Sequence, residues 1–83
     1  MEVTILLGSS SDMPVAEKCT KILKQFDVTY QLRVASAHRS PKFVEQIIHD
    51  AEADGCMVFI AMAGLAAALP GAVAALTTKP VIG

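Results

Sequence analysis

The chain has 83 residues, of which 53% are hydrophobic and 18% are charged, and its formal net charge at pH 7 is −1. This length accommodates one small domain, and the lack of a Lys/Arg cluster, with only three Phe and one Tyr as aromatic residues, argues against nucleic acid as the main partner. So apolar a composition in so short a chain predicts self-association or contact with further protein surface.

The first predicted unit is a strand, a polar loop and a helix. Residues 3–7 are β-branched or apolar without polar alternation, as in a central parallel strand. Residues 8–12 form the loop, and an amphipathic helix follows from Met13 and Pro14. The predicted buried face of this helix consists of Val15, Cys19, Ile22, Leu23 and Phe26.

The second unit repeats this order. A strand is predicted near residues 28–34, and Ser40 followed by Pro41 reads as an N-cap and a first helical position. The helix runs from Pro41 to about Ala53, and Gly55 supplies its C-terminal cap region. Its predicted apolar face consists of Phe43, Val44, Ile47, Ile48 and Ala51.

The third unit contains a buried strand at residues 57–61, a small-residue loop at residues 63–71 and a helix that ends near Leu76. Pro70 predicts that this helix begins late or is kinked. Residues 80–83 have the pattern of the first residues of a fourth strand, with Pro80 tolerated at its start.

This alternation predicts an α/β fold with right-handed crossovers and a parallel sheet covered by helices on both faces. The sequence stops within the predicted fourth strand, so we expect residues 1–83 to form a single partial domain.

An uncharged stretch at residues 56–78 is long enough to span a bilayer. Gly64, Pro70 and Gly71 interrupt it, which favours a buried strand, a loop and an Ala-rich helix over a membrane helix. We therefore expect no membrane partner.

Cys19 and Cys56 lack metal-type spacing, and each lies in an apolar pattern. Both are predicted to be buried free thiols in a reducing compartment, with no metal site. Because Met1 and Glu2 lead directly into a strand without an export signal, we expect a cytoplasmic protein.

Two polar loops follow strands at the predicted carboxyl edge of the sheet, where ligands of parallel sheets bind. In the loop of residues 8–12, hydroxyls and free N–H groups suit a phosphate, while Asp12 suits ribose hydroxyls. The alternative is a helix-capping loop in which Ser11 or Asp12 satisfies backbone donors. In the second loop, His38 can carry a proton near neutral pH and Arg39 can clamp an anion.

Two further features have simpler interpretations. His49 lies in the middle of the second helix and is predicted to face solvent. The loop of residues 63–71 has no side chain capable of acid–base or metal chemistry, so it either lets a flat ligand approach the backbone or lets helices pack closely. The residues by themselves favour packing.

Three motifs together resemble one enzyme family. Residues 8–12 match a G-S-x-S-D loop, residues 36–39 match S-A-H-R, and residues 63–71 are similar to an A-G-G-A-A-H-L-P-G loop. All three occur in this order in the catalytic subunit of phosphoribosylaminoimidazole carboxylase, also called carboxyaminoimidazole ribonucleotide mutase. Leu65 and Ala68 stand where the family has a glycine and a histidine.

The resemblance implies a flavodoxin-like three-layer α/β/α fold, of which this chain matches the N-terminal half, and assembly as a homo-octamer. It implies an aminoimidazole ribonucleotide substrate of purine biosynthesis and no cofactor. By position, the implied phosphate and ribose contacts are Ser9, Ser11, Asp12 and Arg39. Ser36 and His38 are implied to face the imidazole and its carboxylate, with His38 as catalyst, and Gly64 and Leu65 to contact substrate.

Three hypotheses remain at this point. The first is a mutase, in which one histidine protonates nitrogen as a carbamate breaks and later takes a proton from carbon. The second is a non-catalytic nucleotide- or flavin-phosphate-binding module that uses the loop of residues 8–12. The third is an inactive relative that only assembles.

Overall fold

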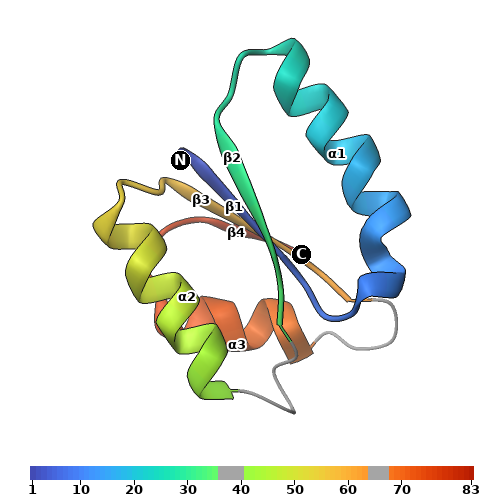
Figure 1. Cartoon of the computed structure of the whole chain (residues 1–83). Helices are drawn as coiled ribbons and strands as arrows, with labels where there is room; N and C mark the ends of the chain where they lie inside the picture. Colours follow the sequence, from blue (N-terminus) through green and yellow to red (C-terminus); the bar gives the residue numbers. More distant parts are fainter. Residues whose placement is uncertain (36–40, 64–67) are drawn as a thin grey trace.

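The computed structural model describes residues 1–35, 41–63 and 68–83 (Figure 1). The elements in chain order are β1 (Val3–Leu7), the 3-10 helix η1 (Ser10–Asp12), α1 (Met13–Gln25), β2 (Tyr30–Val34), α2 (Pro41–Ala53), β3 (Val58–Met62), α3 (Ala68–Leu76) and β4 (Val81–Ile82). The predicted alternation of strands and helices is therefore confirmed.

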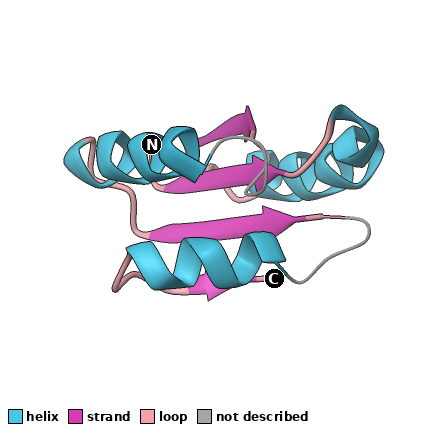
Figure 2. Cartoon of the chain, turned by 90° about the horizontal axis from the view of Figure 1, so that it is seen from below, coloured by secondary structure: helices cyan, strands magenta, loops and turns pink. Residues whose placement is uncertain are grey.

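The four strands form one parallel sheet in the order β2-β1-β3-β4. The chain steps from β1 to β2 in one direction and then crosses β1 toward β3 and β4 in the other. In a right-handed crossover, the direction in which the chain moves along the sheet determines which face the connecting helix covers. α1 therefore covers one face of the sheet, and α2 and α3 cover the other (Figures 1 and 2). The result is the predicted three-layer α/β/α arrangement.

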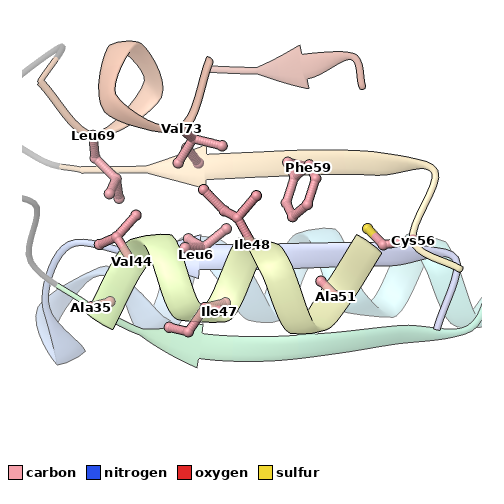
Figure 3. Packing of buried hydrophobic residues seen from close by; sticks show 11 residues of the cluster. Leu6, Ala35, Val44, Ile47, Ile48, Ala51, Cys56, Phe59, Leu69 and Val73 are labelled. Atoms are coloured by element: carbon pink, nitrogen blue, oxygen red, sulfur yellow. The ribbon is translucent and has the colours of Figure 1, made fainter. Parts of the chain in front are cut away.

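The larger part of the core lies between the sheet and the pair α2 and α3 (Figure 3). Helix α2 contributes four side chains at helical spacing, α3 contributes two, and the sheet and its connections contribute the rest. The buried residues of this cluster are Leu6, Ala35, Val44, Ile47, Ile48, Ala51, Cys56, Phe59, Ala61, Leu69 and Val73. Phe43 was predicted to join them and does not: it is exposed, and its ring centroid lies 5.9 Å from the guanidinium carbon of Arg33.

The second part of the core lies under α1 and is smaller. Its buried residues are Val3, Ile5, Leu7 and Ala16, with Met13, Cys19 and Leu23 partly buried beside them. The prediction was wrong for Val15, Ile22 and Phe26, which are exposed. The small side chain of Ala16 lies at the sheet, so the contact stripe is rotated away from these three residues.

Helices α1 and α2 end in the same hydrogen-bond pattern. After α2, Gly55 N–H donates to Glu52 O at 3.1 Å and Cys56 N–H to Ala51 O at 2.9 Å, with Gly55 at a φ of +91°. This is a Schellman cap with the predicted glycine at its left-handed position.

After α1, Asp27 takes that position with a φ of 55°. Its N–H donates to Lys24 O at 3.2 Å, and Val28 N–H donates to Leu23 O at 3.0 Å. A left-handed conformation is unfavourable for a residue with a Cβ. The cap of α1 therefore carries a conformational cost at Asp27 that the cap of α2 does not carry at Gly55.

The predicted third helix begins earlier than expected. α3 starts at Ala68, so Pro70 lies within its first turn, where backbone N–H groups have no intrahelical acceptor and proline costs little. The expectation that the loop extends through Gly71 was wrong for this reason. Strands β2 and β3 are each displaced by one or two residues from their predicted starts.

Cys56 is buried, as predicted: its Sγ–H donates to Val58 O and its sulfur accepts from Thr4 Oγ1, both at 3.3 Å. Cys19 is only partly buried, which corrects the other half of that prediction. Both thiols are free. In the described ranges, no helix has the length and apolar character needed to cross a membrane.

The left-handed cap of α1 generates a prediction. Asp27→Gly should raise the free energy of unfolding by about 0.5–1 kcal/mol, because glycine adopts positive φ without steric cost. Urea denaturation measures this change. Gly55→Ala is the reciprocal variant and should lower stability; a destabilised Asp27→Gly protein would contradict the explanation.

Candidate functional site at the carboxyl edge of the sheet

Strands β1, β2 and β3 end at the same level. In the parallel register, Leu7 pairs with Val34 on one side and with Met62 on the other. Ala35 N–H donates to Leu7 O, and Gly8 N–H donates to Met62 O, both at 2.8 Å. These hydrogen bonds join the three strand ends into one edge, from which the loop of residues 8–12 departs.

Gly8 packs closely at this edge. A Cβ at Gly8 would lie 3.2 Å from the Cβ of Ala63, so a larger residue would require Ala63 to shift by a few tenths of an ångström. The small residues at both positions keep the loop after β1 against the end of β3.

The residues that follow form a capping box. Ser11 N–H donates to Ser9 Oγ, and Ser9 N–H donates to an Asp12 carboxylate oxygen, Oδ2, both at 3.1 Å. The hydroxyls of Ser9 and Ser11 also form a hydrogen bond of 2.8 Å. The three predicted residues of this loop are therefore held together, and the capping interpretation describes what their side chains do in this structure.

The loop also presents polar groups outward. Ser9 and Ser11 are exposed, and Asp12 is partly buried. All three directly precede α1, a helix of 13 residues, so they lie at its positively polarised N-terminus. Hydroxyls next to a helix N-terminus can bind an anionic oxygen. The carboxylate can accept from hydroxyls of a neutral group, so the loop is suited to a phosphorylated sugar.

The remaining predicted site residues are Ser36, His38, Arg39, Gly64 and Leu65, which lie outside the described residues. Their segments follow Ala35 and Ala63, and the structure places both of these at the carboxyl edge beside Gly8. Ala68 is the first residue of α3.

A polar hollow on the α2 and α3 side was not predicted. Its volume is about 480 Å³, and it is lined by Lys42, Glu45, Gln46, Ile48, His49, Glu52 and Leu76. It contains none of the capping-box residues. His49 is exposed here, as predicted. In the parts of the chain that the structure describes, no three His, Cys, Asp or Glu side chains are grouped to hold a metal ion.

Comparison with known proteins adds to this geometry. The family model of AIR carboxylase matches residues 2–83. The chain belongs to the AIR carboxylase family. The resemblance drawn from the three loops is thereby confirmed.

Members of the AIR carboxylase family resemble this chain over nearly its whole length. The N5-carboxyaminoimidazole ribonucleotide mutase of Methanocaldococcus jannaschii is 59% identical over 80 residues, which are 96% of this chain and 49% of that protein. The mutase of Pyrococcus abyssi is 49% identical over 82 residues, 99% of this chain and 47% of that protein. The chain thus spans about half the length of these relatives.

The fold agrees with a solved structure of the family. The crystal structure of Treponema denticola PurE matches with a TM-score of 0.91 and 40% identity, covering 96% of this chain and 51% of that one. The predicted flavodoxin-like fold class is therefore confirmed for this member of the family.

The capping box yields a stability prediction. Ser9→Ala removes the acceptor of Ser11 N–H and should lower the free energy of unfolding by about 1 kcal/mol. Ser10→Ala is the matched control, because the exposed Ser10 side chain makes no hydrogen bond to a described residue. Urea denaturation of both variants tests this, and an equal loss in the two would argue against the capping role of Ser9.

Proposed function

We propose that this chain carries the nucleotide-binding loop and the proton-transfer residue of a carboxyaminoimidazole ribonucleotide mutase. The observation that carries the proposal is the family match over residues 2–83, together with 59% identity to a protein named as that mutase. The names of the relatives favour this function over a flavin-binding module and over a purely assembling relative.

The loop of residues 8–12 would hold the phosphate and ribose. Ser9 and Ser11 already share a hydrogen bond, so their hydroxyls lie close enough to turn toward one phosphate together. The Asp12 carboxylate would repel a phosphate, so we assign it to the ribose hydroxyls. Its Oδ2 atom is fixed by Ser9 N–H, and this leaves the other oxygen, Oδ1, to accept from the sugar.

The base and its carboxylate would lie toward the segments after β2 and β3. We assign Arg39 to the phosphate, and Ser36 and His38 to the imidazole and its carboxylate. Gly64 and Leu65 are assigned to substrate contact through the backbone. The support is the register of β1, β2 and β3, which brings Ala35, Gly8 and Ala63 to one edge.

The reaction needs one proton carrier. When the carbamate C–N bond breaks, its electron pair stays on nitrogen, and the His38 imidazolium donates a proton there. The ring carbon then attacks the released carbon dioxide, a C–C bond forms, and neutral His38 takes the proton from that carbon. Atoms and charge balance without another reactant, so the mechanism requires no metal or cofactor.

We further propose that the chain acts in the cytoplasm as part of a homo-oligomer, with an octamer as the specific expectation. Large apolar side chains that are exposed in the single chain, among them Ile22, Phe26 and Ile82, support assembly.

The anion clamp gives a binding prediction. Arg39→Ala should weaken binding of an aminoimidazole ribonucleotide by about 1.5–3 kcal/mol, the range for a hydrogen bond to a charged group. Calorimetry measures the affinity, and Arg33→Ala, which removes an equal charge at an exposed side chain of β2, serves as control. Equal effects of the two substitutions, or no binding by the parent, would count against the assignment.

The catalytic assignment gives a kinetic prediction. In a chimaera that joins this chain to the unmatched half of the M. jannaschii relative, His38→Asn should lower turnover by about 10²-fold or more with little change in ligand affinity. His49→Asn, at an exposed side chain of α2, is the control and should leave the rate unchanged. Ala68→His in the same chimaera should raise the rate. Near-normal turnover with His38→Asn would eliminate His38 as the catalyst.

A further inference from the structure

Gly8 lies where the loop of residues 8–12 leaves the sheet beside the end of β3 (Figure 1). A Cβ at this position would lie 3.2 Å from the Cβ of Ala63, 3.6 Å from its Cα and 3.7 Å from Met62 O. Of these three distances, only the first is shorter than an ordinary van der Waals contact. The crowding at Gly8 therefore involves one methyl group, that of Ala63.

The backbone conformation of Gly8 does not itself demand glycine. Among the described glycines, only Gly55 has a positive φ, so an alanine at position 8 would not meet left-handed strain. Gly71 also lacks a positive φ, and a Cβ built there has no neighbour within 4 Å. The missing side chain at Gly8 thus acts through its contact with Ala63, and Gly71 offers a matched position without such a contact.

A displacement at this contact falls on a residue just beyond the end of β3. Leu7 and Met62 are paired in the parallel register, and Gly8 N–H donates to Met62 O at 2.8 Å. The loop that starts at Gly8 is held together by its capping box. Since both strand ends and the loop are fixed in this way, Ala63 is the part of the contact that yields.

The contact lies between the two halves of the proposed substrate site. The loop of residues 8–12 is assigned to the phosphate and ribose, and the segment after Ala63 is assigned to further contact with the substrate. A nucleotide that binds both halves has a fixed length, so its affinity depends on their separation. We propose that Gly8 and Ala63 are positioning residues that set this separation through the contact between them. This proposal rests on the proposed function.

The experiment compares two ligands of this chain and of Gly8→Ala, namely an aminoimidazole ribonucleotide, measured by calorimetry, and ribose 5-phosphate, measured by amide NMR titration. Gly8→Ala should weaken nucleotide binding about tenfold, because Ala63 must give way by a few tenths of an ångström and the two halves lose their match. The affinity for ribose 5-phosphate should keep its parental value, because this ligand needs only the capped loop. A general loss of structure would weaken both ligands.

Two further variants control for the size of the added group. In the double variant Gly8→Ala/Ala63→Gly the crowded methyl group of Ala63 is gone, and the nearest remaining neighbours of the new Cβ lie at 3.6 and 3.7 Å. This exchange should recover most of the lost nucleotide affinity. Gly71→Ala adds a methyl group in open space and should change neither affinity.

Three outcomes would overturn this proposal while leaving the proposed function in place. They are parental nucleotide affinity in Gly8→Ala, an equal loss of affinity for both ligands, and a loss of affinity or of folding, seen by circular dichroism, that Ala63→Gly does not reverse. A parent chain that binds no aminoimidazole ribonucleotide would instead overturn the proposed function, and this proposal with it.

Discussion

The buried central strand is the constraint on which the rest of the structure depends. Ile5, Leu6 and Leu7 of β1 are fully buried, and they point alternately into the two halves of the core. A strand buried on both faces and paired on both edges leaves no freedom of register, because a slip by one residue would exchange its two faces. The hydrogen bonds of β1 therefore set the level at which β2 and β3 end.

Thr4 shows how the polar groups of this strand are accommodated. Its hydroxyl is fully buried, accepts from Gln31 of β2 at 3.1 Å and donates to Cys56 Sγ just before β3. The chain of contacts spans three neighbouring segments at the amino end of the sheet. At the carboxyl end, where the loop of residues 8–12 departs, the described contacts include the backbone hydrogen bonds of Gly8 and Ala35, the packing of Gly8 against Ala63 and the capping box.

At that end, structure and proposed function share the same residues. The capping box of Ser9 and Asp12 caps the 3-10 helix η1 directly before α1, and the proposal gives the Ser9 hydroxyl to a phosphate and the remaining Asp12 oxygen, Oδ1, to a ribose. A bound nucleotide would have to replace or extend the capping bonds. The loop is thus held in shape before a ligand arrives, which lowers the ordering cost of binding.

The sequence predicted the elements well and the contact faces less well. Hydrophobic periodicity located the four strands and three α-helices of the described residues, and Gly55 and Pro41 marked α2 correctly, because these signals are local. The 3-10 helix η1 lies in a segment that was predicted as a loop. Periodicity also finds an apolar stripe on α1 without saying which part of it meets the sheet. Val15, Ile22 and Phe26 were misplaced because the contact is decided by the small Ala16 and by the extent of sheet under the helix.

For the site, the sequence identified the loop of residues 8–12 but did not decide between ligand binding and helix capping. The roles of Ser36, His38, Arg39, Gly64 and Leu65 remain predictions, since chemistry at a loop depends on contacts that periodicity does not encode.

The central claim is that the joined carboxyl ends of β1, β2 and β3 bind an aminoimidazole ribonucleotide. Amide NMR during titration of this chain with that nucleotide tests it most directly. The account predicts shifts at Gly8, Ser9, Ser11 and Asp12 and at the neighbouring Ala35 and Ala63, with Glu45, His49 and Glu52 of the polar hollow unchanged. Shifts confined to the hollow, or none at saturating nucleotide, would contradict it.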